Sequence, residues 1–284
     1  MTKRHLGQNF LYDPSILKRI IHVAELNMDD VVVEIGPGYG ILTKMLAETV
    51  KRVIAIELDE ELYRKLKTRL AEYRNVELIH GDALTFPYEN LPEFKVVANI
   101  PYYITTPLLF RLLELKKPFS IHKQEKMEVI PPHPPLEKGG RGDFEVERKL
   151  KSMTITVQKE VAERITASPG GKDYGVLSIM VQYYAESSLQ FIIPKGVFRP
   201  VPKVDSAVIR VKILDKPAVD LKDEKFFFKI VRTSFSQRRK MLSNSLKGIG
   251  ADVKEWLTEA GIDPNRRPET LSIEEFARLA NVIK

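Results

Sequence analysis

The stretch Val31-Val32-Val33-Glu34-Ile35-Gly36-Pro37-Gly38-Tyr39-Gly40 decides the fold of this 284-residue chain. Four of its first five residues are apolar and β-branched, which is typical of a strand buried on both faces. Three glycines then alternate with other residues and indicate a tight turn, and apolar side chains recur at helical spacing in residues 41–47. A strand, a glycine turn and a helix in this order bind nucleotides in α/β folds, although the glycines alone also fit a turn without a ligand.

Three more strands are predicted after this unit, at residues 52–57, 76–80 and 95–99. Glu57 ends the first, Asp82 closely follows the second and Asn99 ends the third. Because open α/β sheets bind ligands at the carboxyl ends of their strands, we expect these three residues and Gly36 to converge there. A carboxylate accepts two hydrogen bonds at once, so Glu57 suits the ribose hydroxyl groups of a nucleotide.

Composition limits the classes of protein to which the chain can belong. Hydrophobic residues make up 43% and charged residues 29%, and no apolar run approaches the roughly 18 residues of a membrane span. The first residues lack the apolar stretch of a signal peptide, so we expect a cytoplasmic protein with no membrane partner. The absence of cysteine excludes disulfides, thiolate metal sites and cysteine nucleophiles. His122 and His133 are isolated among prolines, so we expect no metal site.

The chain divides into parts that differ in composition and in predicted secondary structure. Residues 1–215 alternate strands and helices and begin with an arm, residues 4–11, that we expect to be ordered. Prolines and glycines interrupt this part near residues 118–150, which indicates a flexible insertion. Residues 216–284 are helical throughout, with helices expected near 222–234, 239–247, 253–260 and 273–282, and are predicted to form a second, small domain.

Basic residues gather in the helical part. Seven of them and no acid lie between positions 225 and 247, and this number equals the net charge of the whole chain, +7. A cluster of this kind indicates a polyanionic partner such as RNA, although a solvated basic face without a partner has the same composition. Its members are Lys225, Lys229, Arg232, Arg238, Arg239, Lys240 and Lys247.

Several motifs together resemble the ribosomal RNA adenine dimethyltransferase family. They are His5-Leu6-Gly7-Gln8-Asn9-Phe10-Leu11, residues 34–40, 57–59 and 81–83, Asn99-Ile100-Pro101-Tyr102-Tyr103, residues 158–162, residues 198–206 and Phe235-Ser236-Gln237-Arg238-Arg239-Lys240. The resemblance is closest to KsgA-type members, which modify the small-subunit RNA, more than to the erythromycin-resistance methylases. It covers almost everything except residues near 118–150.

This resemblance implies an α/β fold: a Rossmann-like class I methyltransferase sheet with a small all-helical C-terminal domain. It implies S-adenosylmethionine as the methyl donor, without a metal. The reaction would place two methyl groups on adenine N6 of each of two adjacent adenosines, in a hairpin near the 3′ end of 16S ribosomal RNA. The partner would be small-subunit ribosomal RNA or the pre-30S subunit during its biogenesis, and we expect a monomer.

The resemblance also assigns roles to residues by position. The cofactor-binding set is Asn9, Leu11, Gly36, Gly38, Gly40, Glu57, Asp82 and Asn99, the catalytic set is Asn99, Tyr102 and Phe198, and the RNA-binding set is Arg232, Arg238, Arg239 and Lys240. Glu57 would bind the ribose hydroxyls and Asp82 the adenine amine of the cofactor. Asn99 would orient the acceptor amine while Tyr102 and Phe198 stack on the two faces of an extruded base.

Three other functions fit parts of the same pattern. A nicotinamide oxidoreductase also uses a glycine turn and an acid at a strand end, but its glycines usually follow the spacing G-x-G-x-x-G. A non-catalytic RNA-binding ribosome assembly factor would use the basic helical part equally well. A methylase of the erythromycin-resistance type would act on 23S ribosomal RNA instead.

Overall fold

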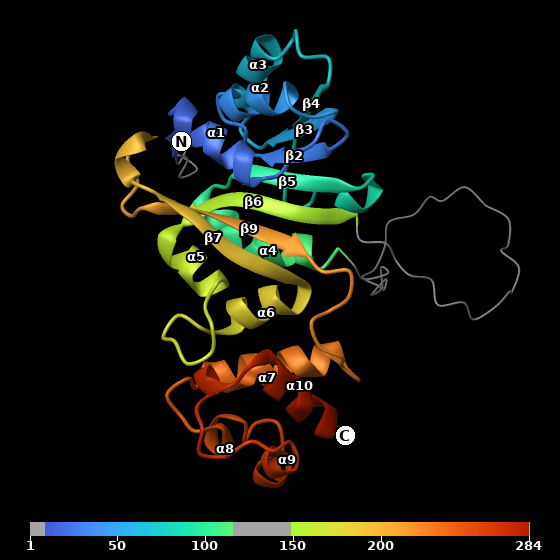
Figure 1. Cartoon of the computed structure of the whole chain (residues 1–284), viewed down its shortest axis with the longest axis vertical. Helices are drawn as coiled ribbons and strands as arrows, with labels where there is room; N and C mark the ends of the chain where they lie inside the picture. Colours follow the sequence, from blue (N-terminus) through green and yellow to red (C-terminus); the bar gives the residue numbers. More distant parts are fainter. Residues whose placement is uncertain (1–8, 116–148, 284) are drawn as a thin grey trace, which may run out of the picture.

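The computed structural model describes residues 9–115 and 149–283. Its main feature is a seven-stranded sheet covered by helices, with further helices at the C-terminal end (Figure 1). The strands are β2 (Val31–Ile35), β3 (Arg52–Glu57), β4 (Val76–His80), β5 (Phe94–Asn99), β6 (Leu150–Gln158), β7 (Ala185–Ile193) and β9 (Ser206–Ile213). The beginning of the predicted arm, residues 4–8, and most of the predicted insertion, with His122 and His133, lie outside the described residues.

The strand order of the sheet determines where a ligand can bind. The order is β4-β3-β2-β5-β6-β9-β7, with β4 to β6 parallel and β9 antiparallel to both of its neighbours. The chain proceeds outward from β2 to β4 and then returns to β5 on the other side of β2. The strand order therefore reverses between β2 and β5, and open α/β sheets bind ligands at such a switch point.

Helices cover both faces of the sheet. Leu17 and Ile20 of α1 (Pro14–Val23) pack with Val32 on one face, together with α2 (Ile41–Ala47). Leu108 of α4 (Thr105–Leu113) packs with Val33 on the other face. Because successive strand residues point to opposite faces, Val32 and Val33 belong to separate cores. Each fully buried aliphatic side chain of this kind stabilises the fold by about 1.5–3 kcal/mol.

Further helices follow the sheet strands. They are α3 (Glu60–Arg69), α5 (Lys159–Ile165), α6 (Val176–Tyr184), α7 (Glu224–Ser236), α8 (Leu242–Ser245), α9 (Val253–Glu259) and α10 (Ile273–Val282). Within the described ranges, no helix is both long and apolar enough to cross a membrane.

Aromatic side chains join the C-terminal helices to the rest of the molecule. Tyr183 of α6 contacts Phe227 and Phe228 of α7, with ring centroids 5.7 and 5.4 Å apart. The hydroxyl of Tyr184 donates a hydrogen bond to Glu224 at 2.6 Å. Figure 1 shows α7 and α10 beside α6, with α8 and α9 beyond them. The division of the chain at residues 215 and 216 into two domains stays a prediction.

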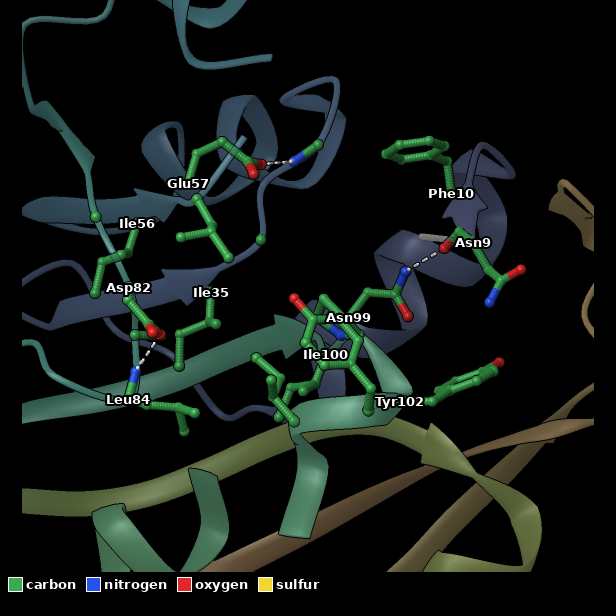
Figure 2. Close-up of a pocket in the computed structure, with 18 residues that line it drawn as sticks. Asn9, Phe10, Ile35, Ile56, Glu57, Asp82, Leu84, Asn99, Ile100 and Tyr102 are labelled. Carbon is green, nitrogen blue, oxygen red and sulfur yellow. Dashed lines mark hydrogen bonds between the residues drawn. The ribbon is translucent and has the colours of Figure 1, made fainter. Parts of the chain in front are cut away.

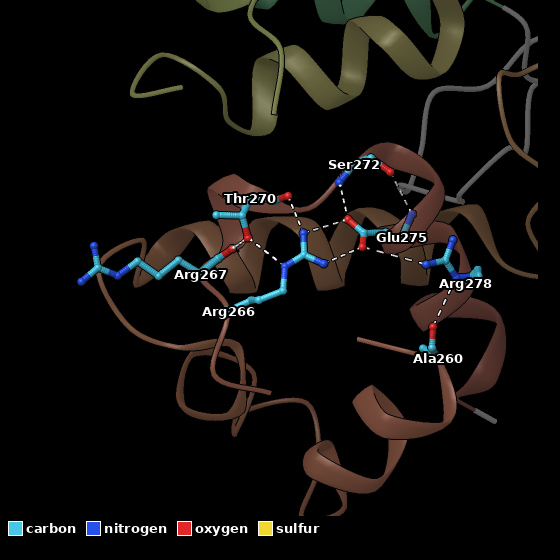
Figure 3. A network of polar contacts seen from close by, with 7 residues as sticks. All are labelled: Ala260, Arg266, Arg267, Thr270, Ser272, Glu275 and Arg278. Carbon is cyan, nitrogen blue, oxygen red and sulfur yellow. Dashed lines mark hydrogen bonds and ion pairs between the residues drawn. The ribbon is translucent and has the colours of Figure 1, made fainter. Parts of the chain in front are cut away.

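A polar network fixes the segment before α10 (Figure 3). Glu275 and the N-cap Ser272 form a capping box, in which Ser272 N donates to Glu275 Oε2 at 2.9 Å. Arg266 donates to both carboxylate oxygens of Glu275, at 2.5 and 3.0 Å, and to the Thr270 carbonyl at 2.6 Å. A bidentate pair is among the stronger ionic hydrogen bonds in proteins. The loop that carries the exposed Arg267 is therefore held to the helix.

The structure corrects the sequence prediction at three places. Pro200 and Pro202 predict a loop over residues 197–206, because proline disfavours regular structure. The structure instead pairs β8 (Phe198–Arg199) antiparallel with β1 (Phe10–Leu11). A strand of two residues is too short to show an alternating pattern in the sequence. Its pairing partner is also remote in sequence, so no local signal predicts it. The apolar residues of 189–193 predict a strand that begins at Leu189, whereas β7 begins at Ala185, directly after α6. Helix α8 has four residues instead of the nine expected over 239–247.

Candidate active site

A pocket opens at the carboxyl ends of β2 to β5, at the switch point of the sheet (Figure 2). Its lining includes all four residues that were expected to converge there, which are Gly36, Glu57, Asp82 and Asn99. Asn9, Phe10, Gly38 and Tyr102 also line it, whereas Gly40 does not. The structure thus brings most of the predicted cofactor-binding residues into one place.

The glycine turn after β2 requires its glycines for conformational reasons. Gly36, Gly38 and Gly40 have φ angles of 67, 58 and 78°, which side chains rarely permit. A Cβ atom at Gly38 would also lie 2.8 Å from the ring of Phe10, and one at Gly40 would lie 2.8 Å from Leu66. Gly38 therefore allows the N-terminal arm to approach the turn, whereas Gly40 serves the start of α2 and its packing against α3.

Glu57 is held as a buried hydrogen-bond acceptor. Its residue is 1% exposed, and its carboxylate accepts from Gly38 N at 3.2 Å and from Asp59 N at 2.9 Å. Burial raises the pKa of Glu57, and these two backbone N–H groups oppose the rise. A carboxylate has about four lone-pair positions, so acceptor capacity remains on the pocket side. Two adjacent hydroxyl groups are a suitable ligand for it.

Asp82 occupies a different environment in the same pocket. It follows β4, is exposed, and accepts a hydrogen bond from Leu84 N through Oδ1 at 2.8 Å. Its Oδ2 has no hydrogen-bond partner among residues 9–115 and 149–283. The carboxylate is therefore oriented by its own loop and can accept a hydrogen bond from an exocyclic amine.

Asn99 has its side-chain amide fixed by the N-terminal arm. Its Nδ2 donates to the main-chain carbonyl of Asn9 at 3.0 Å, as Figure 2 shows. This bond fixes the direction of the amide, and Oδ1, which has no hydrogen bond to any described residue, is the acceptor that remains for a ligand. The pocket therefore contains a side-chain carbonyl that the fold itself orients.

The side chain of Tyr102 is fixed by Ser206, a residue with no predicted role. Its hydroxyl lies 2.6 Å from Oγ of Ser206, which is fully buried at the start of β9. Burial raises the pKa of Tyr102, so the phenol stays neutral near pH 7. Ser206 belongs to the family motif of residues 198–206, but only the fold shows that it contacts Tyr102.

Leu11 and Phe198 lie in the core rather than in the pocket. They are 7% and 0% exposed, and they face each other as partners in the β1 and β8 pair. Neither lines the pocket with Glu57 and Asn99. Leu11 instead lines a smaller cavity that Gly36 and Asn99 also line. Phe198 lies in the core, and its stacking role stays a prediction.

The predicted RNA-binding residues lie on α7 and directly after it. Arg232, Arg239 and Lys240 are exposed, as a phosphate contact requires. Arg238 is half-buried, pairs with Glu269 at 3.7 Å and donates to the carbonyl of Gly171 at 3.1 Å. Within residues 9–115 and 149–283, the side chain of Arg238 therefore has partners that those of the other three lack.

Glu34 is a buried acid in β2 with no predicted role. It is 2% exposed within β2, and its Oε2 has no partner among the described residues. Burial raises its pKa to about 8, so the carboxyl is mostly protonated at neutral pH. The signal in the sequence was an acid inside an apolar strand.

No group of three or more His, Asp or Glu among the described residues could hold a metal ion.

Comparison with known proteins agrees with the predicted resemblance. A family model described as ribosomal RNA adenine dimethylase matches residues 1–284. A protein of Clostridium botulinum named ribosomal RNA small subunit methyltransferase A is 45% identical, with 99% of this chain and 93% of the relative covered. A protein of the same name from Caldanaerobacter subterraneus is 40% identical and covers 99% and 97% of the two chains.

Two solved structures share the fold. The 23S rRNA methyltransferase ErmE is 27% identical, with a TM-score of 0.69 and 97% and 99% of the two chains covered. A dimethyladenosine transferase from Plasmodium falciparum is also 27% identical, with a TM-score of 0.70 and 95% of each chain covered. These neighbours confirm the predicted α/β methyltransferase fold with a helical C-terminal region. This chain therefore belongs to the ribosomal RNA adenine dimethylase family.

Proposed function

We propose that this chain transfers methyl groups from S-adenosylmethionine to adenine N6 in small-subunit ribosomal RNA. The substrate would be two adjacent adenosines in a hairpin near the 3′ end of 16S RNA, each receiving two methyl groups during subunit biogenesis. The observation that carries the proposal is the Asn99 amide, which Asn9 orients at the mouth of a pocket with the Glu57 carboxylate. The names of the relatives at 40–45% identity support the small subunit as the target.

The residues of the pocket fit a nucleoside cofactor. The Glu57 carboxylate, held by two backbone N–H groups, would accept from the ribose hydroxyls, and Asp82 Oδ2 from the adenine amine. Gly36 and Gly38 expose backbone where the methionine part would lie. When bound, S-adenosylmethionine supplies an activated methyl group on a sulfonium centre.

Asn99 would make the acceptor nitrogen more reactive. The lone pair of adenine N6 is delocalised into the ring, so the amine is a weak nucleophile. A hydrogen bond from this amine to Asn99 Oδ1 would hold the nitrogen in position and favour localisation of its lone pair. Its proton can leave after the transfer, so a strong base is not required. The buried Glu34 and the neutral Tyr102 are consistent with a site that works by orientation.

Tyr102 would stack on the target base after the base leaves its own stack. Its ring position is set by the Ser206 hydrogen bond. Phe198 would need to become exposed to take the opposite face, because its side chain is buried against Leu11. We also propose that the chain acts as a monomer in the cytoplasm, where pre-30S subunits would be its partner.

A second candidate is methylation of 23S ribosomal RNA, because the fold matches ErmE over nearly the full chain. The higher identity, 45% against 27%, favours the small-subunit reaction. The test is to incubate the protein with S-adenosylmethionine and with small or large ribosomal subunits from cells that lack the gene. Mapping by primer extension should find dimethyladenosine in 16S RNA alone.

The Asn99→Ala variant is the control for the catalytic assignment. It should bind cofactor and RNA within several-fold of the parent but lose most methyl transfer, since Asn99 orients the acceptor. Normal turnover by this variant would contradict the assignment. Modification of 23S RNA alone by the parent would instead select the second candidate.

A further inference from the structure

We infer that the groove next to the active-site pocket binds the nucleotide adjacent to the methylated adenosine in the RNA chain. This inference rests on the proposed function and adds a substrate subsite to it. The groove has a volume of about 860 Å³, within the roughly 300–1,000 Å³ of small-molecule sites. It lies between the start of α3, the Tyr102–Ile104 turn and the loop from Pro200 to Lys203.

The groove is continuous with the pocket. Asn9, Phe10, Tyr102 and Tyr103 line both. Figure 2 shows Asn9, Phe10 and Tyr102 together on one side of the pocket, away from Asp82. An RNA chain continues on both sides of a base that enters the pocket, so a neighbouring nucleotide must lie at its mouth. The groove is the described cavity that adjoins the mouth at these four residues.

The lining of the groove matches the parts of a nucleotide. Tyr103 is 52% exposed and Val201 is 54% exposed, which gives an apolar surface on which a base can stack. Gln158, at the end of β6, offers an amide donor and an acceptor for the edge of a base. Lys203 is exposed, so it can contact a phosphate.

The acidic residues of the groove set the orientation of the nucleotide. Asp59 caps α3 by accepting from Glu61 N and Leu62 N, and Glu61 pairs with Lys65 at 2.6 Å. Asp59, Glu61 and Lys65 line this wall, and its two carboxylates outnumber its one ammonium group, which disfavours a phosphate there. The phosphate therefore belongs at the Lys203 wall and the base at Tyr103.

The test uses synthetic hairpin RNAs with the target adenosine in the loop. One RNA is intact, one lacks the base on the 5′ side of the target, and one lacks the base on the 3′ side. Their affinities for the full chain are measured by fluorescence anisotropy. The parent should lose about 5- to 150-fold in affinity on one abasic RNA, as expected for one lost base–aromatic stack.

Tyr103→Ala should weaken binding of the intact RNA by a similar factor. The affinity of this variant for that abasic RNA should equal its affinity for the intact RNA. A change in the cofactor site would alter the affinities for all three RNAs by the same factor. The comparison among the RNAs therefore reports on the groove alone. Tyr103→Phe, which keeps the ring, should restore the parent pattern. Equal affinity of the parent for all three RNAs would overturn the inference, and so would an abasic loss that Tyr103→Ala leaves unchanged.

Lys203→Ala tests the phosphate contact. It should lower the slope of binding affinity against salt by about one, because one phosphate contact releases one counterion. The matched control is Lys51→Ala, which removes an exposed lysine before β3 at the opposite edge of the sheet. Equal slopes for the two variants would contradict the subsite. Methylation of small subunits by the parent, measured in parallel, shows whether the proposed function holds when the groove inference fails.

Discussion

The hydroxyl of Tyr102 lies 2.6 Å from the buried Oγ of Ser206, and this bond joins the loop after β5 to the start of β9. The two strands are separated in the sheet by β6. Tyr102, the proposed stacking residue, is therefore positioned from across the sheet. Ser206 acts as a positioning residue that does not line the pocket.

Removal of this bond should slow methyl transfer moderately. Tyr102→Phe and Ser206→Ala should each lower the single-turnover rate of methyl transfer by about 2- to 12-fold, as expected for a hydrogen bond worth about 0.5–1.5 kcal/mol. The double variant should be no slower than the slower single variant, because both remove one interaction. Single-turnover rates at saturating RNA measure this, with the exposed Ser188→Ala as control. If the rate loss of the double variant equals the product of the two single losses, the two residues act separately.

Loss of either pocket carboxylate should weaken cofactor binding. Glu57→Ala and Asp82→Ala should each cost about 1–3 kcal/mol, with the larger effect at Glu57, whose removal leaves the N–H groups of Gly38 and Asp59 without an acceptor. Isothermal titration calorimetry with S-adenosylmethionine gives the comparison. Unchanged affinity in both variants would remove the proposed cofactor site.

The basic residues after α7 should divide into two kinds. Charge reversal of the exposed Arg239 and Lys240 should weaken RNA binding and flatten its salt dependence by about one unit per contact, with the melting temperature unchanged. Arg238→Ala should lower the melting temperature, because Arg238 pairs with Glu269 and Gly171. Thermal unfolding and filter binding on the same variants test both statements. An Arg238→Ala variant of parental stability would contradict the structural role.

Glu34 should make the stability of the protein depend on pH. Its carboxyl ionises near its ordinary pKa of 4.5 in the unfolded chain and near 8 in the folded chain, because it is buried. Between these values the folded state holds one more proton, so the free energy of unfolding falls as pH rises, by up to about 1.4 kcal/mol per unit. Above pH 8 this contribution is constant.

Glu34→Gln should remove that dependence, since an amide of similar shape does not ionise. Denaturant unfolding of parent and variant at pH 5, 6, 7 and 8 gives the difference that belongs to this residue. A difference between the two proteins that stays constant over this range would show that Glu34 is ionised in the folded state.

The sequence by itself determined the sheet and the edge that carries the site. Apolar runs in β2 to β5 and the glycines after Ile35 depend on local physics, namely burial on both faces and backbone angles that side chains resist. The parallel connection then forces Glu57, Asp82 and Asn99 to one edge, so their convergence needed no tertiary detail. The pattern of α10 was equally local, and its predicted bounds, 273–282, agree with the structure.

Only the tertiary structure decided which of these side chains have partners and which are free to bind. The pairing of Leu11 with Phe198, the bond from Asn99 to Asn9 and the contact of Arg238 with Glu269 each join segments remote in sequence. No local pattern encodes such contacts, because they depend on how separate elements pack. Phe198 was therefore expected in the pocket and lies in the core, and Ser206, a residue with no chemical signal of its own, positions Tyr102.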